Sequence, residues 1–168
     1  MRLPAEPPPE QLTAIVDTRE QTPLDLSPLK TQTGTLATGD YSLAGLESVV
    51  AIERKSLSDL LGCIGRERER FDREVQRLLA YPVRALVVET NWLVIERGEW
   101  RGNITPAQVQ GSLLGWSAMG LPVLLVSDHE RAGRAVSRLL YIAARRRWRE
   151  ARALLAEAAG IDALEVQP

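Results

Sequence analysis

Apolar residues alternate with polar ones, or form short runs rich in valine and isoleucine, in several parts of the chain. Residues 13–17 (TAIVD) alternate in this way, which predicts a strand with one buried face. Residues 35–43 (TLATGDYSL) and 48–55 (SVVAIERK) are separated only by AGLE. This arrangement predicts a β-hairpin whose turn places Gly45 at a positive φ angle.

Two further runs are almost continuously apolar, at residues 83–89 (VRALVVE) and 122–127 (PVLLVS). Such runs are typical of strands that are buried on both faces. By contrast, residues 19–34 carry proline, aspartate, serine and glycine without periodicity, which predicts a loop. Residues 91–103 leave helix and loop both open, because two glycines interrupt their apolar pattern.

Helical spacing of apolar residues predicts three helices. The first begins at about residue 57 and continues to 79, and Ser56 and Asp59 have the spacing of a capping box at its start. The second, residues 105–119, opens on a Thr-Pro-Ala-Gln capping sequence. The third begins at Ser127 and ends near Arg149. A hairpin followed by alternating helices and strands predicts an α/β fold in which helices flank a mixed β-sheet.

The length of 168 residues suits one domain with a substantial core. We expect a flexible proline-rich lead-in at residues 1–11, the folded domain at 12–150 and a short helical tail at 151–168. No apolar run is long enough to span a bilayer, and the N-terminus does not resemble a signal peptide. We therefore expect no membrane contact and an intracellular location, in the cytoplasm or nucleoid of a bacterial or phage system and otherwise in the nucleus.

Composition restricts the kinds of site that the chain can form. The single cysteine excludes an internal disulfide, and with a single histidine it excludes a zinc site built from Cys and His ligands. Any bound metal must have oxygen ligands, which favours Mg²⁺ or Mn²⁺. The net charge is −1, but residues 128–152 hold eight arginines against three acids, and acids gather in the N-terminal third. A metal site beside a surface for a polyanion fits this separation.

The strand at 48–55 ends in three adjacent charges, Glu53, Arg54 and Lys55. Because side chains alternate along a strand, Glu53 and Lys55 share one face and Arg54 lies on the other. Asp40, in the partner strand of the hairpin, is expected near Glu53. Two converging carboxylates with an ammonium beside them suit a hard divalent cation, whereas a lone Glu-x-Lys pair is more often an ordinary ion pair.

Three segments, taken in order, carry the pattern of a known family. They are VDTRE at 16–20, GD at 39–40 and ERKSLSD at 53–59. Through them the chain resembles the nuclease domain of the XPF family of structure-specific endonucleases, most clearly over residues 15–89. The resemblance implies a restriction-endonuclease-like mixed sheet flanked by helices. It also implies Mg²⁺- or Mn²⁺-dependent hydrolysis of DNA phosphodiester bonds near branches, flaps or forks.

The resemblance, carried over position by position, assigns roles to individual residues. Asp40 and Glu53 would bind the metal, and Asp17 would contribute directly or through water. Lys55 would orient or activate the attacking water and stabilise charge on the phosphorane. Four further residues match family positions with less defined roles: Arg19, Glu20, Arg54 and Asp59.

Two of these residues also have purely structural alternatives. Asp59 either caps the helix with Ser56 or supports the active site. Arg54 either bridges carboxylates structurally or supports the site by pairing with Asp17 or Glu20.

Basic residues outside the motifs are candidate DNA contacts. Arg66 and Arg70 lie nearest to the predicted site, on a helix whose alternating charges are otherwise typical of a solvated face. Arg145 and Arg146 belong to RRRWRE, which either contacts DNA or is a basic helix end that the helix dipole favours. Trp100 either stacks on an unpaired base or packs on its own domain.

The remaining expectations concern single residues and partners. We expect His129 to be an exposed bystander and Cys63 to be a small buried hydrophobe. The expected partner is DNA, branched or flap-like, bound by a homodimer or by association with a related subunit. The alternative is a non-catalytic DNA-binding or scaffolding subunit, which would be expected to have lost some of its acidic residues.

Overall fold

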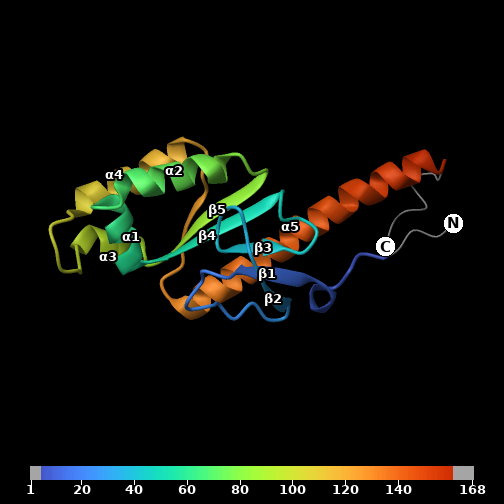
Figure 1. Ribbon diagram of the computed structural model, residues 1–168, viewed down its shortest axis with the longest axis horizontal. Coiled ribbons are helices and arrows are strands. Elements are labelled where there is room, and N and C mark those ends of the chain that lie inside the picture. The colour runs from blue at the N-terminus through green and yellow to red at the C-terminus, as the bar shows by residue number, and fades with distance from the viewer. Residues whose placement is uncertain (1–4, 161–168) are drawn as a thin grey trace.

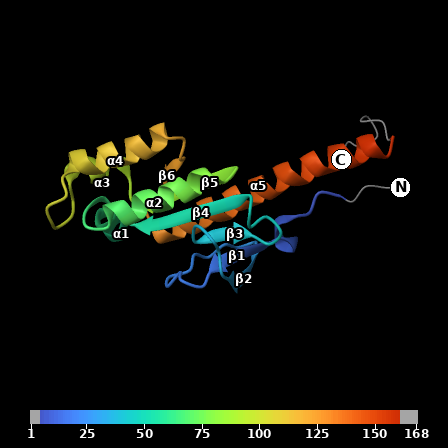
Figure 2. The same cartoon turned by 45° about the horizontal axis from the view of Figure 1, so that its top comes forward.

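The computed structural model describes residues 5–160, and a six-stranded mixed sheet forms its centre. The strand order is β2-β1-β3-β4-β5-β6 (Figures 1 and 2). The strands are β1 (Thr13–Asp17), β2 (Lys30–Gly34), β3 (Tyr41–Leu43), β4 (Val50–Ser56), β5 (Val83–Glu89) and β6 (Val123–Leu125). β3 is antiparallel to both of its neighbours, and all other neighbouring strands are parallel.

Helices cover both faces of this sheet. They are a short 3₁₀ helix (Pro9–Gln11), α1 (Leu57–Ile64), α2 (Arg68–Leu79), α3 (Trp92–Arg97), α4 (Pro106–Ala118) and α5 (His129–Ala158). Figures 1 and 2 show α5 crossing one face while α1, α2 and α4 lie over the other, and the far end of α5 extends beyond the strands. Within residues 5–160, no helix is both long enough and apolar enough to cross a bilayer.

Each face of the sheet has its own apolar core. On the α5 face the buried residues include Val16, Ile52, Val87, Val136 and Leu140. On the other face they include Ala51, Leu60, Phe71, Leu86 and Trp116. Because side chains alternate along β4, positions 50, 52 and 54 face α5, and positions 51, 53 and 55 face α1 and α2. A slip of one residue would exchange the two sets, so burial on both faces determines the register.

The structure confirms the predicted α/β fold and most of its strands. β1 and β5 have the predicted limits. The predicted hairpin is present, since β3 and β4 are antiparallel and Gly45 has a φ of 82°, although β3 is shorter than expected. The second helix also begins as predicted, because Thr105 and Gln108 exchange both hydrogen bonds of a capping box.

Two predictions about strands are wrong. Residues 19–34, expected to be a loop, include β2, which pairs in parallel with β1 at the edge of the sheet. Its side chains are almost all exposed, so no apolar alternation marks it as a strand. β6, expected to be buried, is the opposite edge strand, and all three of its residues are only partly buried.

Two predictions about helices are also wrong. The single helix expected at 57–79 is divided into α1 and α2, because Gly65 takes φ −89° and ψ −114°, which are not helical. The third helix begins after Asp128, whose carboxylate accepts a hydrogen bond from the backbone N–H of Arg131, and not at Ser127. It passes through residue 150, where the folded domain was expected to end, and continues to Ala158. Residues 161–168 of the expected tail and 1–4 of the expected lead-in lie outside the described part of the chain.

Candidate active site

Three acidic residues lie on neighbouring strands or beside them, on the face covered by α1 and α2. Asp17 ends β1, Asp40 immediately precedes β3, and Glu53 lies in β4. The backbone N–H of Asp17 donates to the carbonyl of Asp40 at 2.8 Å, and that of Asp40 donates to the carbonyl of Ile52, also at 2.8 Å. Lys55 lies on the same face, and its ammonium bonds to the carboxylate of Glu53. The structure therefore brings together the four residues to which the resemblance assigned the metal site and the catalytic lysine.

The backbone of β4 and a glycine position Asp40. Its Oδ2 accepts a hydrogen bond from the backbone N–H of Arg54 at 2.8 Å. Gly39 has a φ of 79°, and a Cβ at this position would lie 2.9 Å from the carbonyl oxygen of Ile52. Because any other residue would be strained and would also clash with β4, glycine is required for the close approach of Asp40 to β4.

Asp17 is buried and has both carboxylate oxygens occupied by protein donors. Its Oδ1 accepts from the backbone N–H of Arg19 at 2.9 Å and from the Arg19 Nε at 2.6 Å, and its Oδ2 accepts from the backbone N–H of Leu36 at 2.7 Å. Burial alone would raise the pKa of Asp17, but these donors lower it below its usual value. Asp17 thus connects the segments that follow β1 and β2.

The other two carboxyls have raised pKa values because they are buried and close to other acids. Burial is the main cause for Asp40, and the charges of Glu20 and Asp17 add to it, while the Arg54 N–H and Lys55 oppose it. Burial, followed by the charge of Asp40, raises the pKa of Glu53 to about 7. Like charges held this close in a buried site are stabilised when a cation lies between them.

Lys55 provides part of that positive charge. Burial opposes its charged form, yet Glu53 and then Asp40 raise the pKa of the ammonium above its usual value. Its Nζ also lies 5.4 Å from the centroid of the Phe71 ring, whose face attracts cations. These neighbours keep Lys55 in the form of a fixed cation at the site.

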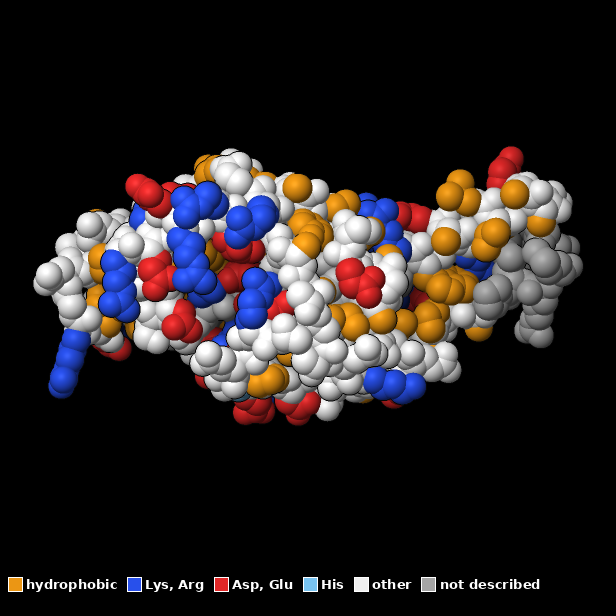
Figure 3. Space-filling view, viewed as in Figure 1, with side chains coloured by type: hydrophobic (Ala, Val, Ile, Leu, Met, Phe, Trp, Pro, Cys, Tyr) orange, Lys and Arg blue, Asp and Glu red, His pale blue; other side chains and the backbone are white. Residues whose placement is uncertain are grey.

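A pocket of about 70 Å³ opens beside Glu53 and Lys55. Its remaining lining residues come from α1, from the following turn and from α2: Cys63, Glu67, Arg70, Phe71 and Glu74. Figure 3 shows acidic side chains recessed among Lys and Arg side chains on this face. The sequence did not single out Glu67 or Glu74, because they belong to an alternating run of charges that is typical of a solvated helix.

The carboxylate oxygens at the site suit a hard divalent cation, but they supply only part of its ligands. Asp40 and Glu53 offer carboxylate oxygens, which Mg²⁺ and Mn²⁺ prefer. Within residues 5–160, no three His, Cys, Asp or Glu side chains converge closely enough to hold a metal by themselves. Asp17 in particular has its oxygens occupied. Mg²⁺ commonly takes one or two carboxylates and fills its other positions with water and phosphate oxygens.

The opposite face of β4 carries a second polar cluster, built on Arg54. Its Nε donates to Glu89 Oε1 at 2.7 Å and its Nη1 to Glu20 Oε1 at 3.4 Å. Its Nη2 lies 3.1 Å from His129 Nδ1, which is also 2.8 Å from Glu89 Oε1. Of the two partners predicted for Arg54, Glu20 is confirmed and Asp17 is not. His129 was expected to be a bystander, and this is wrong, because it belongs to the cluster.

Glu89 joins β5 to this cluster, and it was not among the residues predicted for the site. Its side chain is only 12% exposed, close to the 10% of Arg54 and the 7% of Glu20. Its place at the end of a buried strand, opposite Ser56 in the parallel register, was the available signal. Tyr41 adds a further connection, since its hydroxyl donates to Glu20 Oε2 at 3.1 Å.

Asp59 lies at the start of α1 and acts as part of its cap. Its backbone N–H donates to Ser56 Oγ at 3.1 Å, and its carboxylate accepts from the same hydroxyl at 2.7 Å. Among the described residues, no hydrogen bond or ion pair joins Asp59 to Asp40, Glu53 or Lys55. The observed contacts therefore correspond to the capping alternative.

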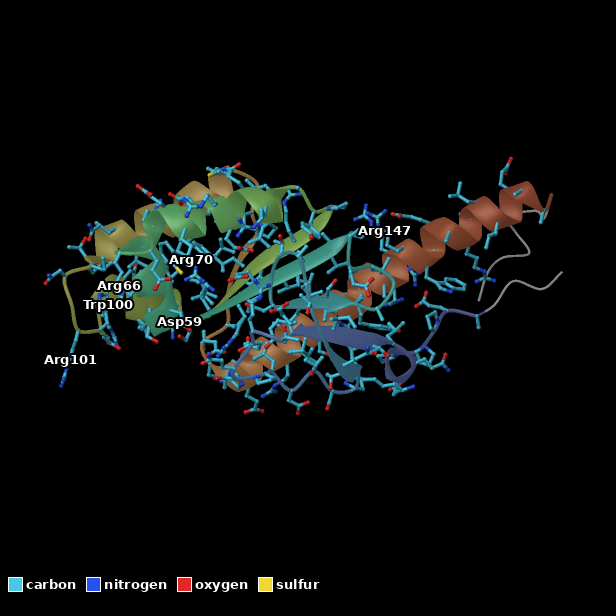
Figure 4. The ribbon with its side chains drawn as sticks, viewed as in Figure 1. Asp59, Arg66, Arg70, Trp100, Arg101 and Arg147 are labelled. Atoms are coloured by element: carbon cyan, nitrogen blue, oxygen red, sulfur yellow. The ribbon has the colours of Figure 1, made fainter. Side chains whose placement is uncertain are left out.

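The predicted arginines on this side of the molecule have different surroundings. Arg70 lines the pocket and pairs with Glu67 at 3.2 Å. Arg66 is exposed in the turn between α1 and α2, and Figure 4 shows it close to the loop that carries Trp100. The indole Nε1 of Trp100 donates to the carbonyl of Ile104 at 2.8 Å, so this side chain packs on its own domain.

Arg145 and Arg146 lie on α5, outside the site. Arg145 pairs with Glu6 at 2.5 Å and Arg146 with Glu150 at 3.4 Å. Figure 4 shows Arg147, the next residue along the chain, far from Arg70. The structure thus does not bring these two candidate DNA contacts to the acidic cluster. Cys63, in contrast, is buried as predicted.

Comparisons with known proteins place this geometry in a family. A model of the ERCC4 domain matches residues 16–139. The structure of XPF from Aeropyrum pernix matches with a TM-score of 0.64 at 20% identity, over 78% of this chain and 61% of that chain. XPF from Aeropyrum pernix in complex with DNA matches with a TM-score of 0.64 at 19% identity, over 79% and 65%.

The alignments thus span less than two thirds of the Aeropyrum chains, and at this level of identity they establish a shared fold. No curated protein matches the chain. The family model, in contrast, covers most of the sequence, including all three motifs that surround the acidic cluster. The chain therefore belongs to the ERCC4 domain family and has the fold of an XPF-type nuclease domain.

Proposed function

We propose that this protein is a divalent-metal-dependent DNA endonuclease that cuts phosphodiester bonds near branched, flap or fork structures. The observation that carries the proposal is the grouping of Asp40 with Glu53 and Lys55, two residues that line a pocket, in a chain with the ERCC4 domain. Buried acids with raised pKa values are costly for stability, and such costs are typical of sites under functional constraint.

The residues have separate tasks in the proposed reaction. Asp40 and Glu53 would hold Mg²⁺ or Mn²⁺, which lowers the pKa of bound water and neutralises phosphate oxygens. The backbone N–H of Arg54 keeps one Asp40 oxygen oriented and leaves the other for the metal. Asp17 would act through water or through the loops that it holds, because its own oxygens already have donors.

Lys55 would stabilise the negative charge that develops on the phosphate during attack. Positive charge fixed in advance at that point lowers the barrier, because it needs no rearrangement when the reaction occurs. Arg70, on the opposite wall of the pocket, is available to contact the same strand of DNA once its exposed pairing with Glu67 opens. An exposed ion pair of this kind costs little to break.

Cleavage assays with matched variants test the proposal. Purified protein is incubated with labelled flap, fork and linear duplex DNA, with Mg²⁺, with Mn²⁺ or with chelator. We expect metal-dependent cutting of the branched substrates, and a loss of about 100-fold or more in Asp40→Asn and Lys55→Ala. Glu47→Gln is the control, because Glu47 is an exposed carboxylate in the turn between β3 and β4.

Two results would contradict the proposal. One is the absence of cutting on every substrate with either metal, and the other is cutting by Asp40→Asn at the rate of the control. If the protein binds branched DNA tightly but no metal supports cutting, the alternative of a non-catalytic DNA-binding or scaffolding subunit is the better description.

Association with a second copy or a related subunit belongs to the same proposal. The outer side of α4 supports it, since Leu114 and Met119 are exposed there beside Gly111 and Gly115, where an added Cβ would meet open space. Close approach of a partner helix favours such small residues together with an exposed leucine. Sedimentation or light scattering as a function of concentration distinguishes a dimer from a monomer.

A further inference from the structure

The loop between α3 and α4, residues 98–105, stands beside the turn that joins α1 to α2. An added Cβ on Gly65, in that turn, would lie 3.2 Å from Ile104 Cδ1, so the two segments are in contact. Trp100 holds the loop in shape through its 2.8 Å hydrogen bond to the Ile104 carbonyl and through packing on the core of this face. These contacts order the backbone of the loop, so the loop presents its exposed side chains from a defined position.

Arg101 is the side chain that this loop presents. It is exposed, and Figure 4 shows it pointing outward from the tip. Within residues 5–160 it has no carboxylate partner, because Glu99 of the same loop pairs with Arg97 at 3.3 Å. Gly102, which follows it, has a φ of 121° and open space around its Cβ position.

Arg66 is a second exposed arginine, and it lies between Arg101 and the site. It too has no ion pair among the described residues. Figure 4 shows Arg101, Arg66 and Arg70 in succession along this side of the molecule, and Arg70 lines the pocket of Glu53 and Lys55. Most other exposed arginines are paired, for example Arg131 with Asp128.

Arg101, Arg66 and Arg70 lead away from the acidic pocket in a row, which suits contacts with successive phosphates of a DNA strand. A guanidinium contacts phosphate oxygens with paired N–H groups. Arg101 and Arg66 lose no ion pair with the described residues in doing so, and Arg70 gives up only its exposed pair with Glu67. A loop that is already ordered also costs little additional entropy on binding.

We propose that the loop at 98–105, with Arg101 at its tip and Arg66 beside it, contacts the phosphates of one duplex arm of the DNA substrate. This arm extends from the cleaved bond past Arg70 and the α1–α2 turn. The inference rests on the proposed function, and it adds that the domain engages its substrate asymmetrically, with more contacts on one side of the cut than on the other.

The salt dependence of binding tests this surface directly. Arg101→Gln and Arg66→Gln are compared with Arg138→Gln, which removes the same charge from an exposed, unpaired arginine on α5, across the sheet. DNA binding is measured by fluorescence anisotropy with chelator present. Each lost phosphate contact reduces the slope of log K against log salt by about 0.9, so we expect a reduction of about two in the double variant. Binding at physiological salt should weaken about three- to tenfold for each single variant, with the control unchanged.

Shortening the substrate identifies the arm. When the contacted duplex arm is shortened stepwise, the difference in DNA affinity between Arg101→Gln and the parent should disappear. Shortening the other arm should leave this difference unchanged. The inference is overturned if the parent cuts DNA but Arg101→Gln and Arg66→Gln bind with the slope of Arg138→Gln, or if neither arm matters. If the parent neither binds nor cuts any DNA, the proposed function fails, and this inference fails with it.

Discussion

Removal of Glu89 should destabilise the domain through the cluster behind β4. Arg54 is 10% exposed and Glu89 12%, so the pair is close to fully buried, and its Nε–Oε1 distance is 2.7 Å. Breaking a buried pair by removing one partner typically costs about 3–5 kcal/mol. Because Glu20 remains 3.4 Å from the guanidinium and some exposure persists, we expect about 2–3 kcal/mol for Glu89→Ala. For a chain of this length that corresponds to a melting temperature lower by about 5–10 °C.

Urea denaturation of three variants measures this effect. Glu89→Ala and Arg54→Met are each compared with the parent, and the double variant completes a thermodynamic cycle. The double variant should lose less than the sum of the two single losses, because the Arg54 guanidinium and the Glu89 carboxylate are removed together and neither leaves the other without its partner. Asp72→Ala is the control. It removes the exposed pair with Arg68, in which the two side chains are 48% and 42% exposed, and it should cost about 0.5 kcal/mol or less.

A loss for Glu89→Ala no larger than that of the control, or an additive cycle, would contradict this prediction. Either result would mean that solvent already compensates the charges of the cluster. Cleavage by Glu89→Ala provides a separate readout. The end of β4 carries both Lys55 and the N–H that holds Asp40, so we expect a lower kcat with little change in DNA affinity.

Three further predictions concern single residues. Gly39→Ala should lower the free energy of unfolding by about 1–3 kcal/mol and reduce cleavage, because its Cβ would press on the Ile52 carbonyl at a positive φ; urea melts and cleavage rates measure both effects. Burial raises the pKa of Cys63 to about 11, so the thiol is neutral at pH 8, and iodoacetamide should label it far more slowly than a free cysteine unless urea is added. Thr105→Ala should cost about 1 kcal/mol in thermal unfolding, because it removes half of the capping box of α4.

Strands whose apolar side chains are buried in a regular pattern, and helix caps with a recognisable motif, were predictable from the sequence. β1, β5 and the capping box of α4 follow from alternation, apolar runs and short motifs. β2 was not predictable, because Lys-Thr-Gln-Thr-Gly buries almost nothing and depends on β1 for its pairing. The break between α1 and α2 was missed because the apolar residues keep the same helical spacing before and after Gly65. The backbone at Gly65 is nevertheless not helical.

The same distinction applies to the site. Alternation in β4 predicted which of Glu53, Arg54 and Lys55 share a face, and the structure has them so. The partners of Arg54 required tertiary information, since Glu89 and His129 come from distant parts of the chain that meet only when β5 and α5 pack against β4. Glu74 was missed for a similar reason, because only the packing of α2 shows that it lies in the pocket.

The contact that orients Asp40 is made by the main chain of residue 54 and not by its side chain. Every residue except proline offers that N–H, so side-chain scanning at position 54 leaves the contact in place. Substitutions there therefore report on the cluster that Arg54 forms with Glu20, Glu89 and His129. At position 54 the hydrogen bond to Asp40 is accessible to experiment only through a change to the backbone itself, such as an amide-to-ester replacement. Substitution of residue 54 by any residue except proline thus preserves the hydrogen bond that orients Asp40, a proposed metal ligand, as long as β4 keeps its register.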